Sequence, residues 1–323
     1  MLRVIDLSSV PEPYPDMVSP GVVVAFGSAT DMASPSAEFW LENATFTLVE
    51  GRTADRRAVT VESVAGALVE LKRRCERWPR ASAVCADVLR VVDPGDPTLT
   101  GLVTESLAYS TLQAGPEFAR WLDERGPVHP PDIAEPLLVD RDGDIVRIRF
   151  NRPQRHNAFS DDVRGALLEA LTVAVMDPAV TEIVLSGNGP SFCSGGDLAE
   201  FGTFDDPASA HLARTRHSPG LLLDALTVRL GPACRAEVHG QVLGSGLEMA
   251  AFCGWVAAKP DSVFGLPELS LGLIPGAGGT VSVTRRIGRW RTAYLVLSGR
   301  TIDVDTAMSW GLVDAAAGGR RQM

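Results

Sequence analysis

The most regular pattern of hydrophobic positions begins at Leu137. Apolar runs at 137–139 and 145–150 flank Asp142-Gly143, a dipeptide typical of a tight turn, and together they predict a β-hairpin. Ser160 precedes an apolar-periodic stretch that extends to about Met176, which predicts a capped helix. Residues 183–185 have the pattern of a buried strand, and strand and helix patterns then alternate to the end. This order predicts a layered α/β domain.

The pattern before the hairpin is mostly helical. Two short strands are expected at 21–26 and 44–49, and three helices follow. Thr60 is expected to cap the first of these helices. The apolar faces of the three helices are expected to carry, in order, Val64, Leu68, Leu71 and Cys75; Leu99, Val103 and Leu107; and Phe118, Trp121 and Leu122.

A linker is expected at Gly126–Pro136, which holds four prolines. Proline interrupts both helices and strand ladders, so such a cluster favours a boundary between folded regions. We therefore divide the chain into an N-terminal mainly helical region, residues 1–130, and a core, residues 131–323.

Composition narrows the classes of partner. The net charge is −10 and the 30 Lys and Arg residues are scattered, so nucleic acid is not expected as a partner. No apolar run approaches the roughly 18 residues of a membrane span, so no membrane partner is expected. The five cysteines form no C-x-x-C pair and the histidines show no metal-site spacing, which predicts reduced thiols in a cytoplasmic protein without a metal.

Two glutamates are the candidate acid/base groups. Glu248 follows a run of small residues that leads from a strand into an apolar helix, and Glu268 lies between Pro267 and Leu269. Burial in such surroundings raises the proton affinity of a carboxylate, as acid/base chemistry near neutral pH requires. The free N–H groups at the start of the Glu248 helix suit an oxyanion. Taken singly, each glutamate could instead be a solvated surface residue.

Five stretches, taken in order, resemble the crotonase (enoyl-CoA hydratase/isomerase) superfamily over about residues 137–315. The last two stretches are the most specific. The five are NRPQRHNAF (151–159), FCSGGDL (192–198), HGQVLGSGLEM (239–249), FGLPELSLGLIPGAGGT (264–280) and SGRTIDVDTAMSWGLVD (298–314).

This resemblance implies a spiral of β-β-α units, assembled as homotrimers or hexamers. It also implies an acyl-CoA substrate whose thioester oxygen is held by the backbone N–H groups of Ser194 and Ser245, with Glu248 and Glu268 as the catalytic carboxylates. No cofactor is implied beyond the coenzyme A of the substrate itself. The CoA-binding positions carried over are Arg155, His156, Ala158, Gly195, Gly196, Asp197 and Leu198.

The residues alone leave two of these positions open. Arg155 could contact a CoA phosphate or could simply be a solvated loop arginine. Asp197 could fix its own turn. The glycine-rich turn 276–279 lacks the lysine of a phosphate-binding loop, so we interpret it as a tight entry into a helix.

The function favoured by the resemblance is syn hydration of a 2-enoyl-CoA in fatty acid metabolism, because both carboxylates are present. An enoyl-CoA isomerase, a CoA-thioester oxygenase and a non-catalytic CoA-binding subunit remain alternatives. The chain departs from the family after Asp314, where further helices usually follow. Residues 105–127 loosely resemble those closing helices, which would make the arrangement a permuted one, although an unrelated helical extension remains equally open.

Overall fold

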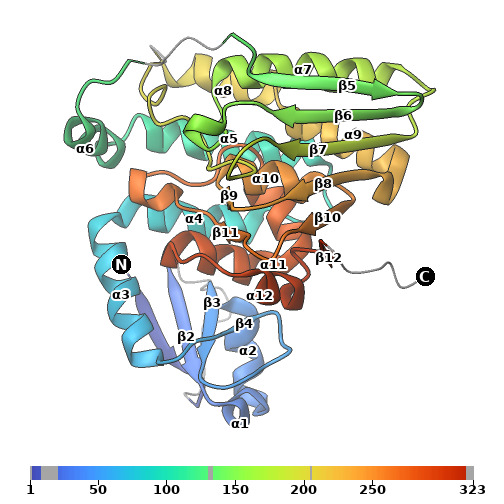
Figure 1. The fold of residues 1–323 in the computed structure, drawn as a ribbon. Helices are drawn as coiled ribbons and strands as arrows, with labels where there is room; N and C mark the ends of the chain where they lie inside the picture. The colour runs from blue at the N-terminus through green and yellow to red at the C-terminus, as the bar shows by residue number, and fades with distance from the viewer. Residues whose placement is uncertain (1, 9–20, 130–133, 204–205, 318–323) are drawn as a thin grey trace.

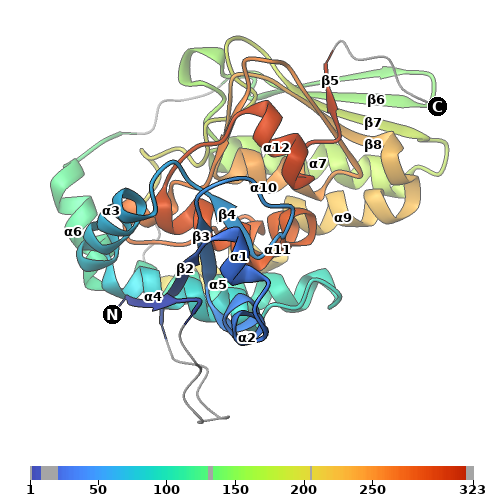
Figure 2. The same cartoon turned by 90° about the horizontal axis from the view of Figure 1, so that it is seen from below.

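The computed structural model describes residues 2–8, 21–129, 134–203 and 206–317 (Figure 1). Two separate parallel-stranded sheets lie at opposite ends of the view, with helices between them. Helix α11 (Gly279–Ser298) packs against α10 (Ser245–Phe252) of the core and against β3 (Phe46–Val49) and β4 (Ala58–Thr60) of the N-terminal sheet. Figure 2 shows the same neighbours from below. Helix α11 therefore contacts both the core and the N-terminal sheet.

The core sheet has six strands in the order β12-β10-β8-β7-β6-β5. All of its neighbours are parallel except the hairpin β5–β6, in which Leu137 faces Phe150. A further parallel pair, β9–β11, lies beside it. The strands are β5 (Leu137–Asp142), β6 (Ile145–Phe150), β7 (Glu182–Gly187), β8 (Cys234–Val238), β9 (Gln241–Leu243), β10 (Trp255–Ala258), β11 (Val263–Gly265) and β12 (Ala315–Ala316).

The helices of the core follow the expected alternation. Helix α7 begins directly after Ser160, whose hydroxyl accepts the N–H of Val163, so the predicted cap is confirmed. The predicted hairpin and α/β class are confirmed as well. The helical segments are η1 (Pro153–Arg155), α7 (Asp161–Met176), α8 (Pro207–Arg216), α9 (Pro219–Leu230), η2 (Gly231–Ala233), α10, η3 (Glu268–Leu271), α11 and α12 (Val304–Trp310).

The N-terminal region contains a four-stranded parallel sheet that the sequence pattern only half predicted. The two expected strands are present as β2 (Val23–Gly27) and β3 (Phe46–Val49). Their outer neighbours β1 (Arg3–Asp6) and β4 (Ala58–Thr60) were missed, because four and three residues are too few for a periodic signal. The helices are α1 (Ala29–Met32), α2 (Pro35–Asn43), α3 (Val64–Arg77), α4 (Pro79–Val91), α5 (Thr98–Gln113) and α6 (Pro116–Arg125).

Two local predictions in this region are wrong. Thr60 ends strand β4 and its hydroxyl donates to the Gly51 carbonyl, so the cap of α3 is Ser63 instead. On α5 the predicted apolar positions Leu99 and Leu107 are half exposed, whereas Glu105 is buried. Glu105 is buried because α5 packs against α8 and α11, and polar groups of these helices form hydrogen bonds with polar groups of α5.

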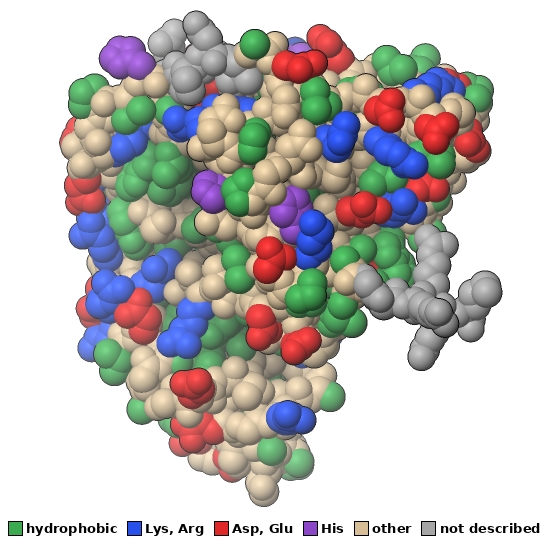
Figure 3. Space-filling view, viewed as in Figure 1, with side chains coloured by type: hydrophobic (Ala, Val, Ile, Leu, Met, Phe, Trp, Pro, Cys, Tyr) green, Lys and Arg blue, Asp and Glu red, His purple; other side chains and the backbone are tan. Residues whose placement is uncertain are grey.

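Figure 3 shows acidic and basic side chains interspersed on one face of the molecule. Within the described ranges, no helix is both long and apolar enough to cross a membrane.

Candidate active site

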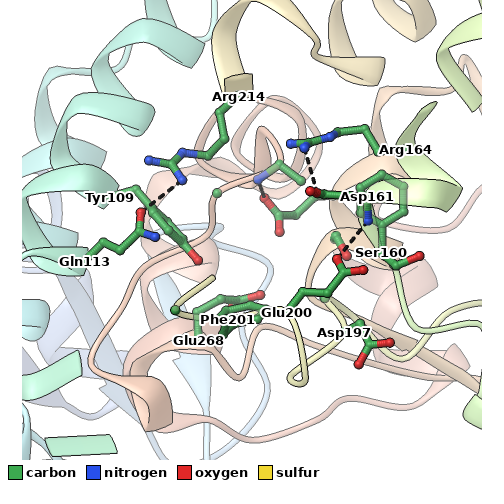
Figure 4. A pocket seen from close by; sticks show the side chains of 17 residues that line it. Tyr109, Gln113, Ser160, Asp161, Arg164, Asp197, Glu200, Phe201, Arg214 and Glu268 are labelled. Atoms are coloured by element: carbon green, nitrogen blue, oxygen red, sulfur yellow. Dashed lines mark hydrogen bonds and ion pairs between the residues drawn. The ribbon is translucent and has the colours of Figure 1, made fainter. Parts of the chain in front are cut away.

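One pocket brings the two predicted glutamates together. Glu248 projects from the first turn of α10 and Glu268 begins η3, and both line the pocket with Ser245 (Figure 4). The remaining walls come from the start of α7, the loop 196–202, the turn 276–277, α5 and α8. Residues 20 positions apart in sequence meet here because β11 returns beside β9, which leads into α10.

Glu248 is fixed by the entrance to α11. Its side chain is 1% exposed, and its Oε2 accepts the N–H groups of Ala277 and Gly279, each at 2.7 Å. A Cβ at Gly279 would lie 2.7 Å from the Glu248 Cγ, so only glycine allows this approach. Burial raises the pKa of Glu248, as do the nearby Glu105 and Glu268 carboxylates, and the two N–H bonds partly offset the rise. The carboxylate is therefore held in one orientation.

Glu268 is buried but less firmly held. Burial raises the pKa of Glu268 to about 8. Its Oε2 has no hydrogen-bond partner among the described residues. A Cβ at Gly244, where φ is +47°, would lie 2.6 Å from the Glu268 Oε1. A buried carboxyl oxygen without a partner marks a place for water or ligand, and the raised pKa favours the protonated form of Glu268.

Two backbone N–H groups of the pocket are free to hold an oxyanion. Ser245 is the first residue of α10, where N–H groups have no partner within the helix, and Gly196 lies in the loop opposite. Neither N–H is bonded to another described residue. A Cβ at Gly196 would lie 2.8 Å from the Phe201 ring, so this glycine packs directly on that ring.

The predicted donor Ser194 is wrong. Its N–H donates to the His156 carbonyl at 2.9 Å, and it does not line the pocket. The bridge between Phe159 and Gly196 uses the N–H groups of Phe159 and Asp197, so the Gly196 N–H, on a residue that lines the pocket, keeps no partner among the described residues. A glycine pair after a strand indicates a close approach of backbone to ligand, but it does not show which of its N–H groups is free.

The predicted CoA-binding residues divide into two groups. Gly196 and Asp197 line the pocket, whereas Arg155, His156, Ala158, Gly195 and Leu198 do not. Asp197 accepts from Arg152 at 2.9 Å and from Arg155 at 2.8 Å, so its charge fixes the loop, as its turn position indicated. Arg155 keeps 38% of its side chain exposed beside this pair. CoA contact at these positions stays a prediction.

Sequence reasoning missed Glu105 as a functional residue. It is 1% exposed on α5, and its carboxylate accepts the N–H groups of Gly278 (2.7 Å) and Thr280 (2.8 Å) and the Thr280 hydroxyl (2.7 Å). Burial raises the pKa of Glu105 to about 7. Glu105 and Glu248 thus alternate along the N–H groups at the start of α11. A glutamate next to small residues in segment 105–127 was the only sequence signal.

Three more pocket residues were missed because they come from distant helices. Tyr109 and Gln113 of α5 face Arg214 of α8, whose Cζ lies 4.3 Å from the centre of the Tyr109 ring. A Cβ at Gly276 would lie 2.5 Å from the same ring, so the turn packs directly on Tyr109. No spacing in the sequence links these positions.

Comparison with known proteins is consistent with this geometry. The model of one family, enoyl-CoA hydratase/isomerase, matches residues 140–320. This chain belongs to that family. The 2,3-dehydroadipyl-CoA hydratase of Escherichia coli is 36% identical over 177 residues, which are 55% of this chain and 67% of the relative. The crotonyl-CoA hydratase of Syntrophomonas wolfei is 32% identical over 181 residues, 56% of this chain and 68% of the relative.

A solved structure of an enoyl-CoA hydratase from Mycobacterium smegmatis superimposes with a TM-score of 0.50 at 30% identity, covering 56% of this chain and 70% of the other. The predicted superfamily and crotonase-like fold are therefore confirmed. Helix α5 lies outside the matched residues of the family model, although it supplies one wall of the pocket.

Proposed function

We propose that the protein is an enoyl-CoA hydratase that adds water syn across the double bond of a 2-enoyl-CoA thioester. One observation carries the proposal: two buried glutamates and two free backbone N–H groups, at Gly196 and Ser245, share one pocket. Membership of the enoyl-CoA hydratase/isomerase family supports it. Hydration needs a base for water, a proton source for the α-carbon and donors for the enolate oxygen, and these groups supply all three.

In this proposal each carboxyl has a separate task. The oriented Glu248 carboxylate takes a proton from water while the water oxygen bonds to the β-carbon. The electron pair of the double bond then forms an enolate, whose oxygen is held by the Gly196 and Ser245 N–H groups. Protonated Glu268 gives its proton to the α-carbon, and proton exchange between the carboxyls restores the starting state. Proximity drives such a pair of carboxyls into different protonation states.

The direct test follows the absorbance of the conjugated crotonyl-CoA thioester after enzyme is added. Loss of absorbance, with 3-hydroxybutyryl-CoA as the product, supports the proposal. If the double bond of a 3-enoyl-CoA migrates and crotonyl-CoA is never hydrated, the isomerase alternative replaces it. A chain that binds acyl-CoA and changes neither substrate is a non-catalytic CoA-binding subunit.

The proposed assembly is a homotrimer or hexamer. Large apolar side chains that remain exposed in the single chain support it, among them Val69, Val173, Met176 and Val228, which are 64–83% exposed. Sedimentation equilibrium at micromolar concentration tests the assembly, and a stable monomer contradicts it.

A further inference from the structure

Arg214 lines the pocket, yet the proposed hydration gives it no role. It projects from α8 beside Tyr109 and Gln113 (Figure 4). Burial lowers the pKa of the Arg214 guanidinium, while Tyr109 and Glu105 raise it. A cation removed from water needs a compensating anion or a full set of hydrogen bonds.

The partners of Arg214 within the described residues are all neutral. Its Nε donates to the Ser106 hydroxyl at 3.2 Å, its Nη1 to the Gln113 Oε1 at 3.2 Å, and its Nη2 to the Ser110 hydroxyl. A guanidinium carries five N–H donors, so these bonds use only three of them. No carboxylate in the described part of the chain forms an ion pair with it.

The other arginine of the pocket is different. Arg164, on the opposite side in Figure 4, pairs with Asp161 at 2.7 Å. Glu105 does not neutralise Arg214 by contact, because both of its oxygens accept hydrogen bonds from Gly278 and Thr280. Of the two arginines that line this pocket, Arg214 is therefore the one without a carboxylate at ion-pair distance among the described residues.

The Arg214 guanidinium is also held in place before any ligand arrives. It stacks over the Tyr109 ring at 4.3 Å, and its three bonds tie α8 to α5. A planar donor group fixed in this way suits a carboxylate, which accepts two parallel N–H bonds from one guanidinium. Arg214 shares the pocket with Glu248 and Glu268, where the thioester itself carries no carboxylate, so a carboxylate that reaches Arg214 belongs to a more distant part of the acyl group.

We infer that Arg214 binds a carboxylate at the far end of the acyl group, so that the preferred substrates are 2-enoyl-CoA thioesters of dicarboxylic acids. The inference rests on the proposed hydratase function and adds a substrate class to it. Arg214 acts as a specificity residue and takes no part in the proton transfers.

The experiment compares thioesters matched in length: trans-2-hexenoyl-CoA with trans-2-hexenedioyl-CoA, and trans-2-octenoyl-CoA with trans-2-octenedioyl-CoA. The expected result is a higher kcat/KM for the diacid in at least one pair. Arg214→Gln lowers kcat/KM for that diacid roughly 10- to 100-fold, the range for loss of a charge-assisted bond, and leaves the neutral partner within about threefold.

Arg164→Gln is the matched control, because its charge is already paired with Asp161, and it keeps the diacid preference. Equal kcat/KM for acid and neutral thioesters in the unmodified enzyme overturns the inference and leaves the hydratase function standing. An equal loss on both substrates in Arg214→Gln overturns it in favour of a structural role. If neither thioester is hydrated at all, the proposed function itself fails. If Arg214→Gln does not fold, Arg214→Lys is measured in its place. The inference is then judged from that variant and from the ratio of kcat/KM for the diacid to kcat/KM for the neutral thioester in the unmodified enzyme.

Discussion

The pocket has two walls of different origin. The core supplies the two glutamates that we assign to catalysis and the free N–H groups of Gly196 and Ser245, and it carries the five stretches that resemble the family. The N-terminal region supplies α5, with Tyr109 and Gln113 on the pocket and Glu105 beneath the turn that holds Glu248.

The two walls differ in the role that we assign to them: the core carries the reacting groups, and the N-terminal region positions them. Every reacting group that we assign lies in the core, where short motifs fix its backbone. The α5 groups touch the core through side chains: Glu105 holds the entrance to α11, and Tyr109 packs on Gly276. The N-terminal wall therefore shapes the site and sets the position of Glu248 without reacting itself. Four predictions test this division.

The largest effect is expected from the core glutamates. Glu248→Gln and Glu268→Gln each lower kcat for crotonyl-CoA hydration by roughly two orders of magnitude or more, because each removes a positioned acid or base. KM changes little, since neither residue binds the CoA moiety. Stopped-flow or steady-state absorbance measures both constants. Near-normal turnover in Glu268→Gln would remove that residue from the chemistry and end the hydratase interpretation.

The next effect concerns the oxyanion donors. Ser245→Pro removes an N–H group at the first position of α10, where proline is tolerated, so we expect an intact fold and roughly 100- to 1,000-fold lower kcat. Ser245→Ala is the matched control and keeps most activity, because the backbone donates. Circular dichroism checks the fold of both variants. An active, folded Ser245→Pro enzyme contradicts the assignment.

A smaller effect is expected from the N-terminal wall. Glu105→Gln replaces an oxygen with an NH2 group that cannot accept the N–H of Gly278 or Thr280, so the turn that holds Glu248 shifts. We expect about tenfold lower kcat, an unchanged KM and about 1–3 kcal/mol lower stability.

Glu117→Gln is the control for Glu105. Glu117 is also buried in the N-terminal region, but it accepts the N–H groups of Arg80 and Ala81 at the start of α4. Its loss should lower stability by a similar amount and leave kcat unchanged. Equal kcat losses in the two variants would show that Glu105 acts through stability alone.

The last prediction is a pH dependence of stability and does not concern the reaction itself. Because the pKa of Glu268 is raised to about 8, the folded state binds a proton that the unfolded state releases above about pH 4.5. The stability from this proton is complete below pH 4.5 and is lost as pH rises through about 8. Glu268→Gln removes this contribution and leaves those of Glu105 and Glu248, so the melting temperature of the variant relative to the unmodified protein rises between about pH 5 and pH 8. A constant difference contradicts the raised pKa.

Sequence alone was most informative where local backbone chemistry decides the structure. The Asp142-Gly143 hairpin and the Ser160 cap follow from turn and cap geometry within a few residues. The glycine-rich turn 276–279 is a helix entry, as its composition indicated. The five motifs identified the family and both glutamates, because they occur in the same order as in the family and each fixes the position of the next.

Tertiary structure alone decided which groups meet and which N–H groups stay free. Ser194 was a reasonable oxyanion donor in sequence, but its N–H donates to the His156 carbonyl, whereas that of Gly196 has no partner among the described residues. Glu105 and Gly278 are 173 positions apart, and Arg214 meets Gln113 across 101. Such contacts depend on how α5 packs against α8 and α11. The residues that a side chain contacts on another helix produce no periodic pattern in the sequence, so the sequence alone does not predict them.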